Sequence, residues 1–63
     1  MENNLRKVKA RETEIGKTKD GYFHVWGQRG NTTEDIVTFG IVELTDGQVI
    51  TAAPWNIRFV ESF

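Results

Sequence analysis

Three ring-bearing residues, Tyr22, His24 and Trp26, occupy every second position of a short aromatic segment. Because side chains alternate between the two faces of a β-strand, this spacing predicts that the three rings share one face. Aromatic side chains with polar tips offer a large contact area at low entropic cost, which suits recognition of a protein, a peptide or a base. The alternative is that the rings pack beneath a connecting segment or against Trp55, and the spacing leaves both interpretations open.

Other residues have side chains that could take part in catalysis, but the sequence shows no partners for them. His24 would act as a general base only beside a nucleophile or an orienting carboxylate, and the sequence shows neither. Glu34 and Asp35 are adjacent, so we expect their side chains to diverge.

Trp55 follows Pro54 and is expected on an exposed turn, where it could shape a ligand groove or cover one end of the fold. Residues 13–20 contain no aromatic side chain, which argues against recognition of proline-rich peptides.

Basic residues collect toward the amino end. With the two tryptophans, six of them could contact and stack on a nucleic acid, and the affinity would then fall steeply with salt. These candidates are Arg6, Lys7, Lys9, Arg11, Arg29 and Arg58. The alternative is a solvated strand edge that its charges protect from pairing. A formal net charge of -1 is not that of a dedicated nucleic-acid-binding protein.

The composition excludes several classes of site. The chain has no cysteine and one histidine, which rules out disulfides, thiolate zinc sites and histidine-rich metal sites. It also lacks a glycine-rich phosphate loop, so we expect no enzyme activity, no cofactor and no metal. No apolar run approaches the roughly 18 residues of a membrane span, and no signal peptide is evident. The expected location is the cytoplasm, without membrane contact.

The 63 residues make one domain, 1–63, in which residues 1–5 are expected to lack order. Asp46 and Gly47 form a turn signal between two runs rich in β-branched residues, which predicts a tight hairpin. Pro54 cannot donate a ladder hydrogen bond and should end a strand in a short 3₁₀ turn. The expected strands are residues 6–15, 22–26, 36–44, 49–53 and 57–61, and the first of these could instead be a frayed helix.

Five short strands without a covering helix must bury their apolar faces on one another. We expect an all-β fold, a small five-stranded barrel. The order of its parts, a long first connection, a hairpin and a 3₁₀ turn before the last strand, resembles Src-homology-3 (SH3)-like barrels. Alternation predicts a core of Phe23, Val25, Val37, Phe39, Ile41, Val49, Ile57 and Phe59. Four apolar residues remain for barrel corners, for partial burial under the amino-terminal segment or for a homodimer interface: Ile36, Val42, Leu44 and Ile50.

Three segments, 21–26, 41–49 and 54–59, resemble a class of short uncharacterised proteins encoded in phages and prophages of Gram-positive bacteria. That class has a Phe-His-x-Trp run, an Ile-Val-Glu-x-x-Asp-Gly hairpin and a Pro-x-x-Ile-x-Phe ending, in this order. The likeness covers about residues 21–60. It implies a phage-derived origin and brings no activity with it.

The leading hypothesis is a non-enzymatic, phage-derived accessory protein. It would bind a host or phage protein through Tyr22, His24 and Trp26, with Trp55 nearby. The alternatives are nucleic-acid binding through the basic residues and a structural homodimer.

Overall fold

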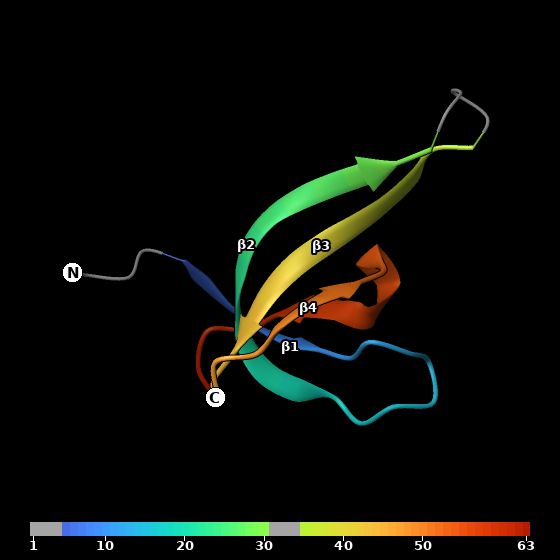
Figure 1. Cartoon of the computed structure of the whole chain (residues 1–63). Coiled ribbons are helices and arrows are strands. Elements are labelled where there is room, and N and C mark those ends of the chain that lie inside the picture. The colour runs from blue at the N-terminus through green and yellow to red at the C-terminus, as the bar shows by residue number, and fades with distance from the viewer. Residues whose placement is uncertain (1–4, 31–34) are drawn as a thin grey trace.

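The computed structural model describes residues 5–30 and 35–63, which form one curved sheet (Figure 1). The elements are β1 (Arg6–Ala10), β2 (Lys19–Arg29), β3 (Val37–Leu44), β4 (Val49–Ala52), the 3₁₀ turn η1 (Pro54–Asn56) and β5 (Ile57–Phe59). All neighbouring strands are antiparallel, in the order β4-β3-β2-β1-β5. The expected all-β class with five strands is confirmed. The two edge strands, β4 and β5, share no ladder in the described part of the chain, so the sheet is not closed by hydrogen bonds.

The strand bounds differ most from expectation at the amino end. β1 ends at Ala10 rather than at residue 15, and residues 11–18 form a loop. β2 is longer than the aromatic segment at both ends. Of the residues expected to lack order, 1–4 lie outside the described residues, and Leu5 is half-buried. Glu34 also lies outside them. Within the described residues, no helix has the length and apolar character needed to cross a membrane.

The predicted hairpin between β3 and β4 is confirmed. Gly47 adopts a φ of 96°, a region that L side chains disfavour and glycine allows. The N–H of Leu44 donates to the carbonyl of Gln48 at 2.7 Å, and the N–H of Gly47 donates to the carbonyl of Leu44 at 2.9 Å. The Asp46 carboxylate accepts the N–H of Gln48 at 3.0 Å. These bonds fix the register in which β4 returns along β3.

The 3₁₀ turn predicted at Pro54 is also confirmed, and Asn56 joins it to the first strand. Asn56 is buried, and its side-chain oxygen accepts Nε–H of Arg11 at 3.1 Å. Its carbonyl accepts the N–H of Arg11 at 3.2 Å. Two bonds to one residue therefore hold η1 against the end of β1, so the last strand can pair with β1.

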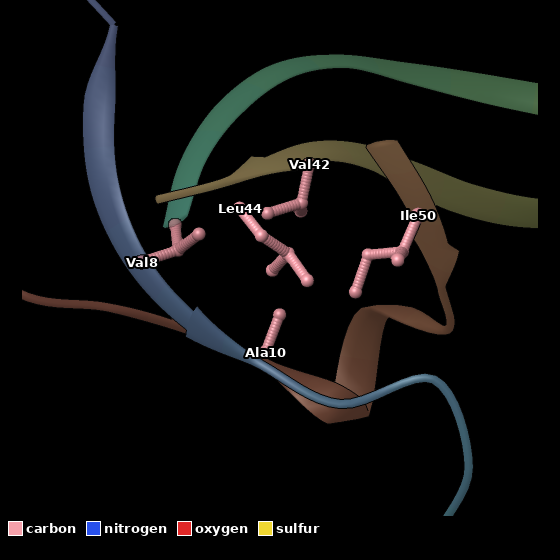
Figure 2. Packing of buried hydrophobic residues seen from close by; sticks show 5 residues of the cluster. All are labelled: Val8, Ala10, Val42, Leu44 and Ile50. Carbon is pink, nitrogen blue, oxygen red and sulfur yellow. The ribbon is translucent and has the colours of Figure 1, made fainter. Parts of the chain in front are cut away.

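The core forms where the sheet curls back on itself. Val8 and Ala10 of β1 meet Val42 and Leu44 of β3 and Ile50 of β4 in one cluster (Figure 2). A flat sheet would separate β1 from β4 by three strand spacings, about 14 Å, which is too far for such side chains to meet. Curling therefore places the two strands on opposite sides of the same core.

The predicted core is only partly correct. Phe23, Ile57 and Phe59 do pack against the buried cluster. The assignments for the third and fourth strands are wrong, because Val37 is 55% exposed and Val49 is 64% exposed.

The residues left over, Val42, Leu44 and Ile50, are the ones buried, while Phe39 and Ile41 are half-buried on the outer face. Ile36, the fourth leftover residue, is exposed, and Val25, also predicted inside, is 52% exposed.

This error has a physical cause. Residues 36–44 are apolar at both alternating sets of positions, so either set could form a core face. The set that became buried is the one that Val8 and Ala10 cover.

Gly21 marks a close approach between β2 and β3. A Cβ at this position would lie 2.8 Å from the carbonyl oxygen of Glu43 and 2.8 Å from Cγ1 of Val42. Replacing Gly21 by alanine is expected to lower the free energy of unfolding by about 1–3 kcal/mol, because the backbone oxygen cannot move aside without disturbing the ladder. Urea denaturation measures this change. The control is Gly16→Ala in the exposed loop, for which we expect a change within about 0.5 kcal/mol. Equal midpoints for the two variants would contradict the close approach.

Candidate functional site

The predicted stripe of Tyr22, His24 and Trp26 is broken by a β-bulge. The ladder between β2 and β3 shifts register between Phe23 and Val25, which leaves His24 as the extra residue. A bulge adds one residue to one strand. Side chains beyond it therefore point to the opposite face from the one that strict alternation would give. Tyr22 and Trp26 therefore lie on opposite faces, and the prediction that the three rings share one face is wrong.

Trp26 belongs to the inner face. It lies opposite Gly40, and its ring packs on Phe23 with a centroid distance of 4.8 Å. Phe23 in turn contacts Phe59 edge-on at 5.2 Å, and the guanidinium of Arg6 lies 4.2 Å above the Phe59 ring. Trp26 is 43% exposed and extends the core toward one end of the sheet. Its contacts are those of a packing residue.

Tyr22 and His24 remain on the outer side, and both contact other parts of the chain. The Tyr22 ring meets Phe63 edge-on at 5.7 Å. Nε2 of His24 lies 2.9 Å from Oε1 of Glu43, and both side chains are partly exposed. An exposed pair of this kind contributes at most about 1 kcal/mol. These two residues do not form a large open aromatic surface.

Trp55 is 71% exposed, more than Phe63 at 47% and Trp26 at 43%. Its Nε1–H donates to Oε1 of Glu14 at 3.1 Å, which joins η1 to the loop of residues 11–18. The ring borders a groove of about 290 Å³, which we call the Trp55 groove. Its lining residues are Glu12, Arg29, Val37, Thr38, Phe39, Thr51, Ala52, Ala53 and Trp55. The expectation that Trp55 stands on an exposed turn is confirmed.

The groove runs along a strand edge that β4 leaves open. β3 pairs with β2 over its whole length, but β4 pairs only with residues 40–43. On that side, residues 37–39 therefore have no ladder partner among the described strands. Phe39 provides the apolar surface beside this edge. Its ring covers Gly27 of β2, where a Cβ would lie 2.7 Å from the ring, and the Arg29 guanidinium stacks on it at 4.9 Å.

The charges of the groove are divided between its two sides. Arg29 lies at the end of β2, opposite Val37. Glu12, which lines the groove, and Glu14, which accepts the Trp55 indole N–H, both come from the loop of residues 11–18. A bound molecule would therefore meet negative charge beside Trp55 and positive charge beside Phe39.

Sequence reasoning identified Trp55 and Arg29 but missed the rest of this groove. Val37 and Phe39 were expected in the core, because apolar residues at both alternating positions gave no sign of which set would be outside. Glu12 and Glu14 were expected within the first strand, residues 6–15, and were not singled out as site residues. Only the fold shows that residues 37–39 extend beyond β4, and no local pattern reports where a neighbouring strand stops.

The six basic candidates for nucleic-acid contact do not share one surface. Arg6 lies on the same side of β1 as Val8, since residues two apart share a face, and it covers Phe59. Four others have intramolecular partners: Lys7 lies over Phe63, Lys9 pairs with Asp20 at 2.7 Å, Arg11 bonds Asn56 and Arg29 stacks on Phe39. Arg58 is opposite Lys9, whereas Arg29 lies at the far end of β2. The geometry gives a nucleic acid no single basic track.

Comparison of the chain with protein-family models, with curated proteins and with solved structures finds no match.

Proposed function

We propose that this chain is a small, non-enzymatic protein-interaction module that binds an extended segment of a partner protein in the Trp55 groove. The observation that carries the proposal is the exposure of Trp55 beside an unpaired strand edge. Tryptophan is enriched at the centres of protein interfaces, where burial of its large ring contributes much of the affinity. An indole held in place by Glu14 presents such an anchor before any partner arrives.

The size of the groove favours a peptide segment over a small molecule. Pockets for drug-sized ligands have volumes of about 300–1,000 Å³ and bury most of the ligand, and this groove of about 290 Å³ is at the lower limit. A strand edge offers something different, since an extended segment can add its own backbone to the sheet while its side chains fill the groove. The open edge spans only residues 37–39, so side-chain contacts with Trp55 and Phe39 must supply much of the affinity.

The proposal includes the fold and the origin expected from the sequence. The strand order β4-β3-β2-β1-β5, the curl around one core and the 3₁₀ turn before β5 support an SH3-like barrel arrangement. The resemblance of residues 21–60 to phage and prophage proteins supports a phage-derived accessory role, with a host or phage protein as the partner.

Selection from a random peptide library tests this function directly. Peptides displayed as extended segments are selected on the immobilised chain, and the enriched sequences are then titrated into ¹⁵N-labelled protein. We expect enriched peptides to share a pattern and to shift the indole N–H signal of Trp55 and the amide signals of residues 37–39. Failure to enrich any peptide, or shifts confined to other surfaces, would refute the proposal.

A structural homodimer is a second candidate, favoured by the outer face of the sheet. Val25, Val37 and Val49 are all more than half exposed there, and Ile41 lies between Val25 and β4. Contiguous exposed apolar side chains of this kind are typical of interfaces. Sedimentation at several concentrations separates the two: a dimer whose association is weakened by Val25→Thr and Val49→Thr would support this candidate, and a monomer at all concentrations would exclude it.

A further inference from the structure

We propose that the Trp55 groove selects a segment that carries a lysine or arginine, whose cationic group lies on the Trp55 ring beside Glu12 and Glu14. This inference rests on the proposed function and names the chemistry of the partner. It follows from the surroundings of the aromatic rings.

Three rings in the structure already have a cation from the chain itself. The guanidinium of Arg6 lies over Phe59 at 4.2 Å, Nζ of Lys7 is 5.7 Å from the centre of the Phe63 ring, and Arg29 stacks on Phe39 at 4.9 Å. Trp55 has a different environment, because its indole N–H donates to the carboxylate of Glu14 at 3.1 Å. Tryptophan is the best aromatic acceptor for a cation, so its exposed face is suited to a cation from outside the chain.

The position of the Trp55 ring is fixed in advance. Its Nε1–H is held by Glu14, and its backbone lies in η1, which two bonds from Arg11 to Asn56 hold against β1. Binding therefore requires little additional ordering of the indole, which improves affinity for a given set of contacts. The ring edge that carries the N–H is occupied, and the face remains available.

The carboxylates beside the ring are not neutralised by a short ion pair. The two ion pairs within residues 5–30 and 35–63 join Lys9 to Asp20 and His24 to Glu43, and neither includes Glu12 or Glu14. A cation on the ring would therefore gain attraction from both carboxylates as well as from the ring itself. An acidic segment would instead be drawn toward Arg29 and repelled beside Trp55, which makes it the opposite outcome of the test.

Four matched peptides test the inference. Each is a capped seven-residue peptide of alternating threonine and valine, with lysine, arginine, leucine or glutamate at its centre. Titration into ¹⁵N-labelled full chain at low salt follows the Trp55 indole signal. We expect the lysine and arginine peptides to bind about tenfold more tightly than the leucine peptide, from one cation–π contact and two exposed charges. The glutamate peptide should bind most weakly.

Charge variants identify the residues responsible. Glu12→Gln combined with Glu14→Gln keeps an acceptor for the indole N–H and removes both charges, so the preference for lysine over leucine should fall to about twofold, the low end for an exposed cation–π contact alone. The control is Glu61→Gln, which removes an exposed carboxylate outside the groove and should leave the preference unchanged. Equal losses in the two variants would show a general charge effect and overturn the inference.

The outcomes separate this inference from the proposed function. Equal affinity for all four peptides, with shifts at Trp55 and residues 37–39, would overturn the choice of a cation and leave the function intact. Enrichment of acidic or purely apolar peptides in the library selection would do the same. Absence of binding in both experiments would refute the proposed function itself.

Discussion

Replacement of Leu44 by alanine is expected to lower the free energy of unfolding by about 2–5 kcal/mol, the range for loss of a buried leucine side chain. Leu44 is 3% exposed and lies in the cluster where β1, β3 and β4 meet. A domain of this size is stable by only about 3–9 kcal/mol, so the variant should lose much of its stability. Denaturation in urea, followed by far-ultraviolet circular dichroism, measures the change.

Two valines provide a matched control for this prediction. Val42→Ala and Val49→Ala remove the same atoms, but Val42 is fully buried and Val49 is 64% exposed. We expect Val42→Ala to reduce stability by about 1.5–3 kcal/mol, and Val49→Ala to change it by less than about 0.5 kcal/mol. The opposite order would mean that the other face of β3 and β4 forms the core, as alternation alone had suggested.

The second large effect is expected at Trp55. Trp55→Ala should weaken binding of a selected peptide by about 30-fold or more, which corresponds to the 2 kcal/mol or more of an interface hot spot. Its effect on stability should be small, since the side chain is 71% exposed. Peptide titration and urea denaturation of the same variant measure the two effects separately.

Trp26→Ala is the matched control, because it makes the same substitution on the inner face. Trp26 packs on Phe23 and extends the core, so we expect its loss to reduce stability by about 1–3 kcal/mol, less than for a fully buried tryptophan. Peptide affinity, measured where the variant is folded, should stay within about threefold of the parent value. A loss of binding in Trp26→Ala with unchanged stability would return the site to the aromatic segment of β2 and contradict the Trp55 groove.

One strand connects the core to the candidate site. Alternate residues of β3, Val42 and Leu44 among them, hold the core, whereas Val37 and Phe39 face the groove. Stability and binding therefore depend on different residues of the same strand. This division makes the two sets of variants above independent tests.

Local signals predicted the fold elements well where a single residue type has a strong backbone preference. Gly47 permits the positive φ of the hairpin, and Pro54 ends β4, so both turns could be located from the sequence.

The candidate site was predicted less well. Trp55 was placed correctly on an exposed turn, but the aromatic stripe was divided by a bulge at His24. In a bulge, two residues of one strand lie opposite one residue of its partner. The residue spacing within one strand therefore does not reveal it.

The sequence by itself determined that the protein is all-β, that two turns lie at residues 46–47 and 54–56, and that chemistry based on thiols is absent. Those conclusions depend on residue types and on local backbone preferences. Tertiary structure decided which face of β3 and β4 is buried, and it exposed Trp55 beside the open edge at residues 37–39. The reason is that burial depends on which distant strand covers a face, and β1 reaches β4 only after the sheet has curled.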